Sequence, residues 1–215
     1  MDLSNSLVRS PVGNEVYDAG YFRCHAGGAS VFERFIQTGA AETYPIYHRI
    51  IRTLKAQPNE GVLDVGCGRG EVIGLFAMKG LQAFGVDFSI AALQIASTLR
   101  DAFAKDHGIY FHLIQADATA LPFPARYLDH IVLSDIVEHL HDWQLDKLYS
   151  ECWRVLRPHG KVVVHTWPNL WHTKYTYPLV ARISRLLTIP RHLNHRKPDD
   201  QIMHVNEQSL RSLRY

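Results

Sequence analysis

Strong charge and paired cysteines are both missing from this 215-residue chain. The formal net charge is only +2 at pH 7, whereas a nucleic-acid-binding protein usually carries a strongly basic face. The three cysteines, Cys24, Cys67 and Cys152, lie far apart in the sequence. Their odd number and wide spacing argue against a disulfide framework and a zinc site. A reducing, cytoplasmic location is therefore expected.

The sequence also has little that would take it to or through a membrane. Residues 1–10 contain no apolar segment of the signal-peptide kind, and no apolar run is long enough to span a bilayer. Internal repeats and low-complexity segments are absent too. The composition is that of a globular protein, with 47% hydrophobic and 20% charged residues, and the length is that of one ordinary domain.

From residue 61 onward, apolar β-rich segments alternate with helix-like segments. Strands are expected over residues 61–66, 82–89, 109–117, 129–135 and 161–167. Helices are expected over residues 41–56, 70–80, 90–105 and 136–157. This alternation predicts an α/β fold, a Rossmann-like doubly wound and mostly parallel sheet with helices on both faces. Ligands of such sheets bind beyond the carboxyl ends of the strands.

The glycine-rich segment VLDVGCGRGEV, residues 62–72, joins the first expected strand to a helix. Its spacing, Gly66-x-Gly68-x-Gly70, is one residue shorter than the dinucleotide fingerprint. Asp64 inside the strand is unfavourable beside a pyrophosphate and suits a cationic ligand with an amino group. A purely structural Asp64, bonded to loop amides, is the alternative. Cys67 is expected to be a small residue that fits the turn rather than a nucleophile.

Three further strand ends carry polar side chains. Asp87 ends the second strand, where a carboxylate can accept hydrogen bonds from both ribose hydroxyls. Asp117 ends the third strand and could take an adenine amino group, with the amide of Ala118 on the ring. Ser134 and Asp135 end the fourth strand and are expected to face the reacting end of the ligand.

Five segments in this order resemble the successive motifs of class I S-adenosylmethionine-dependent methyltransferases, over about residues 45–168. These segments are VLDVGCGRGEV, GVDFS, QADATALPFP, DHIVLSDIVEHL and LRPHGKVVV. The resemblance implies S-adenosyl-L-methionine as cofactor, S-adenosyl-L-homocysteine as product, and a seven-stranded sheet whose last strand is antiparallel. Only five strands are visible here, so strands six and seven are expected to be absent or truncated.

The resemblance also implies which residues bind the cofactor. Near the methionine part it places Asp64, Gly66, Cys67 and Gly68, and Gly70 of the same loop is grouped with them. At the ribose and adenine it places Asp87, Phe88, Asp117 and Ala118, with Ser134 beside the methyl donor.

The segment SDIVEHL supplies the candidate catalytic residues Asp135, Glu138 and His139, which would share one face of a helix. With the later His204 they resemble an array that holds a divalent metal in ubiquinone-pathway O-methyltransferases and small-RNA 2′-O-methyltransferases. Such donors would suit Mg²⁺, Mn²⁺ or Fe²⁺. A metal is not favoured, however. In one alternative His139 acts as a general base without a metal, and in the other Glu138 and His139 only form hydrogen bonds around the start of the helix.

Residues 1–40 are expected to form an arm or lid, and residues 41–215 the S-adenosylmethionine-binding domain. The arm is rich in aromatic residues, for which ordinary packing is the alternative to a lid. A basic cluster over residues 182–197 is expected to be a solvated face rather than a site for an anionic acceptor.

Together these features predict a methyltransferase of class 2.1.1 acting on a small-molecule acceptor, with oxygen favoured over nitrogen or carbon. One alternative is a module that binds S-adenosylmethionine without turnover. A nucleic-acid 2′-O-methyltransferase is disfavoured by the mild charge, and an NAD-dependent oxidoreductase by the loop spacing. The sequence indicates neither the acceptor nor the oligomeric state.

Overall fold

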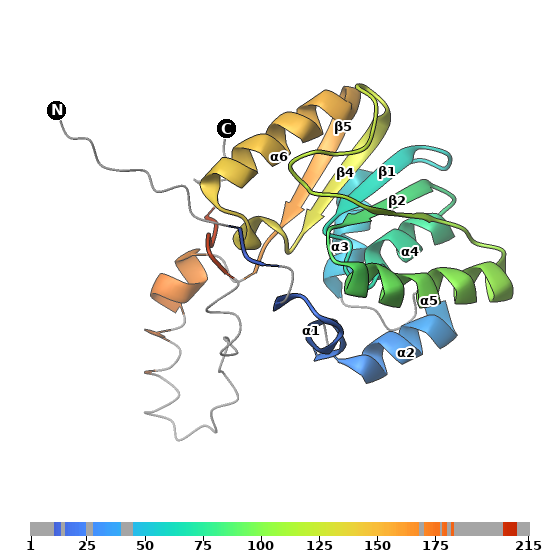
Figure 1. Ribbon diagram of the computed structural model, residues 1–215, viewed down its shortest axis with the longest axis horizontal. Coiled ribbons are helices and arrows are strands. Elements are labelled where there is room, and N and C mark those ends of the chain that lie inside the picture. The colour runs from blue at the N-terminus through green and yellow to red at the C-terminus, as the bar shows by residue number, and fades with distance from the viewer. Residues whose placement is uncertain are drawn as a thin grey trace.

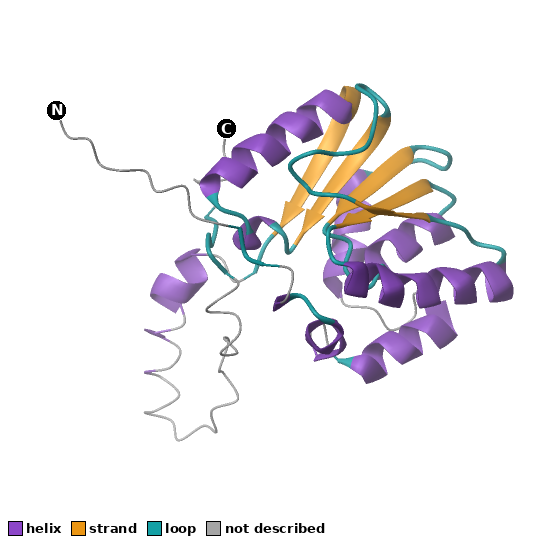
Figure 2. Cartoon of the chain, viewed as in Figure 1, coloured by secondary structure: helices purple, strands orange, loops and turns teal. Residues whose placement is uncertain are grey.

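The computed structural model describes residues 11–13, 16–24, 28–39, 45–167, 170–176, 178–179, 182 and 204–209. Within these residues the fold is a five-stranded sheet with helices on both faces (Figures 1 and 2). The strand order is β3-β2-β1-β4-β5, and all neighbours run parallel. The predicted doubly wound α/β fold is confirmed, and no sixth or seventh strand occurs among the described residues.

The strands are β1 (Gly61–Val65), β2 (Gln82–Asp87), β3 (His112–Gln115), β4 (Leu128–Ser134) and β5 (Leu156–His165). The α-helices are α1 (Ala19–Cys24), α2 (Ala29–Thr38), α3 (Pro45–Leu54), α4 (Glu71–Met78), α5 (Ile90–His107) and α6 (Asp142–Val155). Two shorter helical elements are the 3₁₀ helix η3 (Val137–His139) and the π-helical η4 (His172–Thr176). None of the described helices is long and apolar enough to cross a membrane.

The order in which the chain adds strands to the sheet reverses between β1 and β4. From β1 the chain moves outward to β2 and β3 on one side, and then returns to β4 and β5 on the other. The two carboxyl ends that flank this reversal are the place where open α/β sheets bind their ligands. The sequence-predicted site residues stand at or near these ends.

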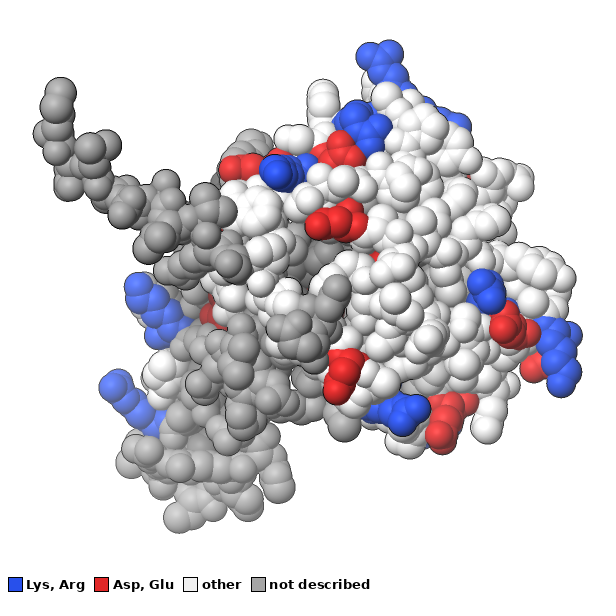
Figure 3. All heavy atoms as spheres, in the orientation of Figure 1, with Lys and Arg blue, Asp and Glu red and all other residues white. Residues whose placement is uncertain are grey.

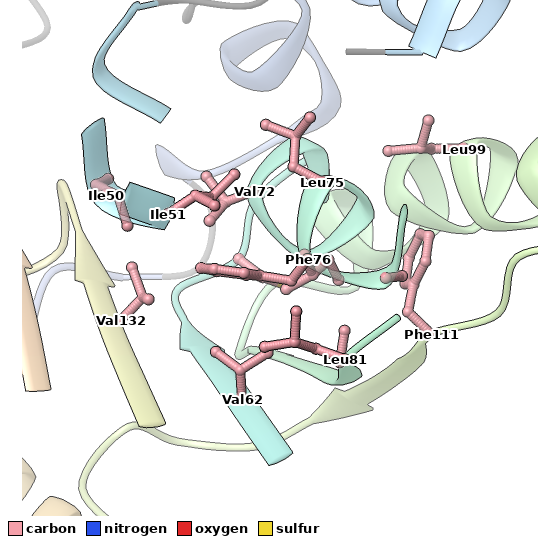
Figure 4. Packing of buried hydrophobic residues seen from close by; sticks show 14 of the residues in the cluster. Ile50, Ile51, Val62, Val72, Leu75, Phe76, Leu81, Leu99, Phe111 and Val132 are labelled. Atoms are coloured by element: carbon pink, nitrogen blue, oxygen red, sulfur yellow. The ribbon is translucent and has the colours of Figure 1, made fainter. Parts of the chain in front are cut away.

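The hydrophobic core has two parts, one on each face of the sheet. On one face α3, α4 and α5 bury side chains such as Ile50, Phe76 and Leu99 (Figure 4). On the other face α6 packs against the sheet through Leu148. Successive β1 residues alternate between these clusters, because side chains in a strand point to opposite faces. β1 is buried along its whole length.

Part of the predicted arm belongs to the core. Phe32 and Phe35 of α2 are buried in the cluster that α4 and α5 share, and the Phe35 ring lies 5.6 Å from that of Phe103. Ordinary packing thus accounts for α2. The predicted boundary at residue 40 lies outside the described residues.

The single helix expected over residues 136–157 is wrong. Asp135 has a φ of 53°, η3 covers only three residues, and Leu140 is extended before α6 begins. His141 caps α6 in a reciprocal pair with Gln144. Because there is no continuous helix here, Asp135, Glu138 and His139 do not share one helical face. Their positions follow from the positive φ of Asp135 and the short η3 instead.

The strand expected over residues 161–167 also has different bounds in the structure. β5 begins at Leu156, which pairs with Leu128, and the next pair joins His130 to Lys161. The residues between them on β5 form an irregularity in the strand, where His159 has a φ of 70°. The expected strand over 109–117 is likewise shorter, His112–Gln115.

Candidate active site

The loop after β1 depends on glycine conformations. Gly66 has a φ of 72°, and a Cβ there would lie 2.9 Å from the Cδ1 atom of Ile136, so a larger residue would be strained and crowded. The amides of Gly66 and Cys67 both donate to the carbonyl of Val86 on β2, at 2.7 and 3.0 Å. Gly70, with a φ of 88°, begins α4. The loop is thus fixed to the end of β2.

Cys67 lies in the space that a glycine on β2 leaves open. A Cβ at Gly85 would approach the Cys67 Sγ atom to 2.8 Å. Burial raises the pKa of the Cys67 thiol well above its usual value, and the charges of Asp87 and Asp64 add to the effect. Because the thiolate is the reactive form, these contacts support the interpretation of Cys67 as a residue that fits the turn.

Asp87 at the end of β2 connects the glycine loop to α5. Its Oδ2 accepts the Gly68 amide at 2.9 Å and its Oδ1 accepts the Ser89 amide at 2.9 Å. Burial raises the pKa of Asp87, and these backbone hydrogen bonds oppose that rise. Each carboxylate oxygen can accept a second hydrogen bond, so the side chain could still bind two hydroxyl groups.

Asp64 is a buried carboxylate in the centre of the sheet, 2% exposed. Its Oδ1 has no hydrogen-bond partner within the described part of the chain. Burial raises its pKa well above the usual value, and the charges of Asp87 and Asp135 raise it further. A buried polar atom without a partner calls for an explanation, and a cation in the adjoining cavity would provide one.

Two adjoining cavities lie at this edge of the sheet, with volumes of about 350 and 140 Å³. Both are lined by Tyr21, Phe22, Gly66 and Asp135. Other sequence-predicted residues in the larger cavity are Asp87, Phe88, Asp117, Ala118 and His139. Those in the smaller one are Asp64, Cys67, Gly68 and Ser134. The structure thus brings the predicted residues together, except Gly70 and Glu138, which line neither cavity.

The described part of the arm forms the opposite wall of the larger cavity. Tyr17 packs edge-on against Phe88, with ring centroids 5.3 Å apart, and its carbonyl accepts the Ser89 hydroxyl at 2.8 Å. Its hydroxyl lies 3.1 Å from the Nδ1 atom of His139. Tyr17 is one of the aromatic residues of the predicted arm, but no sequence feature indicates this contact.

Arg69 fixes the arm to the glycine loop, a role that the sequence did not indicate. Its Nη1 donates to the carbonyls of Phe22 and Gly28, at 3.3 and 3.1 Å. Its guanidinium pairs with Glu71 and lies over the Phe32 ring, 4.9 Å from the centroid. Arg69 is 4% exposed, so this buried cation holds together elements that are distant in sequence.

The predicted catalytic residues separate into two groups. Asp135 Oδ1 lies 2.9 Å from His165 Nδ1 at the end of β5. Burial would lower the pKa of His165, but Asp135 outweighs this effect and raises it. Glu138 is buried, and burial together with the charge of Asp135 raises its pKa to about 8. The His139 ring stands edge-on to that of His204, with centroids 4.8 Å apart.

Glu138, His139 and His204 could hold a metal ion, since one ligand atom from each lies within 4.8 Å of the others. The segment 204–209 positions His204: the Asn206 amide donates to the Glu138 carbonyl at 3.0 Å, and the Asn206 side chain donates to Asp142 at 2.7 Å. Asp135 stands outside this cluster. The predicted four-residue array is therefore divided, and three of its members converge.

A parallel sheet with a glycine loop after β1 and carboxylates at two strand ends defines a Rossmann-like protein of the kind that binds adenosine-containing ligands. The comparisons with known proteins make this more specific. Residues 62–160 match a family model described as a methyltransferase domain. The matched part of the chain thus resembles a methyltransferase domain, which agrees with the resemblance to class I S-adenosylmethionine-dependent methyltransferases seen in the motifs.

Relatives of known name agree with this assignment. The chain is 32% identical over 105 residues to a ubiquinone biosynthesis O-methyltransferase of Leptothrix cholodnii, covering 49% of this chain and 43% of that protein. It is 34% identical over 114 residues to a ubiquinone/menaquinone biosynthesis C-methyltransferase of Vibrio campbellii, covering 51% and 42%. The chain thus spans less than half the length of these curated relatives.

A solved structure has a similar fold. The YcgJ protein of Bacillus subtilis superposes with a TM-score of 0.56 at 26% identity, covering 77% of this chain and 62% of that chain. The family model and the curated relatives support the predicted methyltransferase class, and this solved structure supports the predicted fold. The methylated atom differs even between the two curated relatives, one an O- and the other a C-methyltransferase.

Proposed function

We propose that this chain is an S-adenosylmethionine-dependent methyltransferase that transfers a methyl group to a small-molecule acceptor, with oxygen the favoured acceptor atom. The observation that carries the proposal is Asp64. A buried carboxylate with an oxygen that lacks a hydrogen-bond partner in the described chain, next to a cavity, fits a ligand that carries a positive charge. A pyrophosphate-containing ligand would be repelled there.

The residues present fit S-adenosylmethionine, which supplies an activated methyl group when bound. Asp64 and the loop at Gly66 and Gly68 would hold the methionine part in the smaller cavity. Asp87 would accept the ribose hydroxyls in the larger one. Asp117 and Ala118, beside Phe88, would hold the adenine. Gly66 lines both cavities, so one extended ligand could reach from one to the other.

For an oxygen acceptor, His139 is the residue we assign to proton removal. It lines the larger cavity together with Asp135, and the Tyr17 hydroxyl contacts its Nδ1. A general base must lie within hydrogen-bond reach of the proton that it takes, and His139 is the imidazole in this wall. Asp135 contributes negative charge near it, while Glu138, whose pKa is raised to about 8, holds its proton at neutral pH. The arm excludes water from the acceptor.

Calorimetric titration with S-adenosylhomocysteine, S-adenosylmethionine and NAD tests the proposal. We expect micromolar binding of the first two ligands and none of NAD. Methyl transfer is then measured by product formation with phenolic and catecholic acceptors. Tight NAD binding without a response to S-adenosylhomocysteine would overturn the proposal, and binding without transfer to any acceptor would leave only a binding module.

A metal-assisted version of the same reaction is the second candidate, favoured by the convergence of Glu138, His139 and His204. A bound divalent ion would lower the pKa of the acceptor hydroxyl in place of a general base. Activity after EDTA treatment, with Mg²⁺ and Mn²⁺ added back, separates the two versions. We expect activity to survive EDTA. A complete loss that Mn²⁺ restores, mimicked by His204→Ala, would favour the metal instead.

A further inference from the structure

Large apolar side chains are exposed at every fourth position after β5. Trp167, Trp171, Tyr175 and Leu179, which we call the aromatic stripe, are between 48% and 60% exposed. Trp171 and Tyr175 lie on the helical stretch Leu170–Thr176, which includes η4, and residues four apart on a helix are neighbours on its surface. Trp167 precedes this stretch and Leu179 follows it in the sequence. This segment lies beside the carboxyl ends of β4 and β5, in orange in Figure 1.

Other exposed apolar side chains in the described chain are isolated by comparison. Trp153 lies on α6, Tyr110 precedes β3 and Ile90 begins α5. Single exposed hydrophobic residues are normal, whereas a contiguous exposed group marks an interaction surface. The spacing and shared segment of the aromatic stripe place it in the second category.

The sequence that carries the stripe has charged residues of one sign. The sequence from residue 152 to residue 198 contains no aspartate or glutamate, although acidic and basic residues are nearly balanced in the whole chain at 21 and 23. Its basic residues from the stripe onward are Lys174, Arg182, Arg185, Arg191, Arg196 and Lys197. Arg154, Arg157 and Lys161 lie at the far end of β5 instead, where they bind Glu151, Asp129 and the Leu54 carbonyl. By contrast, charges of both signs are interspersed over the sheet-bearing part in Figure 3.

We propose that the aromatic stripe docks on an anionic lipid bilayer. Tryptophan and tyrosine favour the membrane–water interface, because one end of each ring system is apolar and the other polar. Basic residues beside such a group are attracted to anionic headgroups, and Lys174, whose Nζ lies 5.7 Å from the Tyr175 ring centroid, stands within the stripe. A second copy of this chain would bring two basic segments together, so it is the less favourable occupant.

Docking would bring the candidate active site close to the bilayer. The stripe begins two residues after His165, which ends β5 and pairs with Asp135 in the cavity wall. The Leu170 amide donates to the Gln208 carbonyl at 2.9 Å, and so attaches this helical stretch to the segment that carries His204. An amphipathic acceptor could then pass between bilayer and cavity.

Vesicle co-sedimentation of the full chain tests the docking directly. Vesicles of 70% phosphatidylcholine and 30% phosphatidylglycerol are compared with pure phosphatidylcholine, without cofactor. We expect the anionic vesicles to bind at least tenfold more tightly, and 0.5 M salt to remove most of that difference. The triple variant Trp171→Ala, Tyr175→Ala, Leu179→Ala should bind them at least tenfold more weakly than the unaltered chain.

Trp153→Ala is the matched control, because Trp153 is 86% exposed yet lies near the end of α6. There it is separated from the stripe by the ten-residue length of β5. It should bind within twofold of the unaltered chain. Equal binding to both kinds of vesicle, or a triple variant that binds as the unaltered chain does, would overturn the proposal. A lipid-independent dimer that the triple variant abolishes would assign the stripe to a second copy and overturn it too.

Thermal shift with S-adenosylhomocysteine, measured on each variant, shows that it is folded and separates this proposal from the proposed function. A chain that binds anionic vesicles without responding to S-adenosylhomocysteine would contradict the proposed function alone. A triple variant with an intact thermal shift and lost vesicle binding supports the docking independently of any acceptor.

Discussion

The two halves of the candidate active site are built in different ways. In the half at β1 and β2, hydrogen bonds between neighbouring strand ends fix the loop backbone: Asp87 binds amides of Gly68 and Ser89, and the glycine loop rests on the Val86 carbonyl. The half at β4 and β5 is assembled from distant segments. His139 meets Tyr17 of the arm, 122 positions away, and also His204.

This difference explains why the half at β1 and β2 suits a cofactor that is always the same, and the half at β4 and β5 suits an acceptor that can vary. A loop fixed by backbone hydrogen bonds to a neighbouring strand keeps its geometry whatever the outer segments are. A wall made by an arm and a late segment changes whenever those segments change. We therefore expect substitutions at the β1 and β2 ends to affect cofactor binding strongly, and substitutions in the arm to affect turnover moderately.

Asp87→Ala is the substitution with the largest expected effect on the β1–β2 half. It removes both hydrogen bonds that we assign to the ribose. At about 1.5 kcal/mol for each bond to a charged group, the affinity for S-adenosylhomocysteine should fall about 100-fold. Calorimetry measures this directly. Asp101→Ala, at an exposed position on α5, is the control and should bind normally; an unchanged affinity in Asp87→Ala would sink the ribose assignment.

Gly66→Ala tests whether the glycine loop depends on its backbone. Both Gly66 and Gly108 have positive φ, 72° and 66°, but a Cβ at Gly66 meets Ile136 at 2.9 Å while one at Gly108 meets nothing within 4 Å. Backbone strain should lower the free energy of unfolding of Gly108→Ala by about 1 kcal/mol. Crowding should lower that of Gly66→Ala by about 2 kcal/mol more. Urea unfolding compares them, and equal losses would show that Ile136 moves aside freely.

Asp64→Asn tests the same cofactor half with a smaller expected effect. The affinity for the cofactor should fall about tenfold, which corresponds to about 1.4 kcal/mol. Burial raises the pKa of Asp64, so the free protein keeps this proton to a higher pH than an ordinary carboxyl does, and a bound cation would favour its release. Cofactor affinity should then increase with pH up to the raised pKa, with proton release on binding. Calorimetry in buffers of different ionisation enthalpy detects that proton, and the variant should release less. Identical proton release in both proteins would contradict the Asp64 assignment.

The same shift has a consequence for stability. A carboxyl whose folded-state pKa is raised binds its proton more tightly when folded, so it costs stability as pH rises above the unfolded value near 4. Asp64→Asn removes that cost. The variant without ligand should therefore be the more stable protein at neutral pH, and its advantage should shrink as pH falls toward 4.

What the sequence could predict follows the same division. The glycine loop and the strand-end residues Asp64, Asp87 and Asp117 were readable because local spacing determines them. The interruption between η3 and α6 could not be predicted, because the apolar periodicity continues across it and His141 is not a usual N-cap residue. The contacts of Arg69 and Tyr17 gave no local signal, since their partners lie 41 and 122 positions away along the chain.

Tyr17→Phe should have the smallest effect and tests the assembled half. The variant keeps the ring packing against Phe88 and Tyr21 but loses the hydroxyl beside His139. One neutral hydrogen bond contributes about 0.5–1.5 kcal/mol, so kcat should fall about threefold, while the affinity for S-adenosylhomocysteine stays within twofold. Tyr110→Phe, at an exposed position, should change neither quantity. If Tyr17→Phe lowered cofactor affinity and left kcat intact, Tyr17 would belong to the cofactor half, and the contrast between the two halves would fail at its clearest contact.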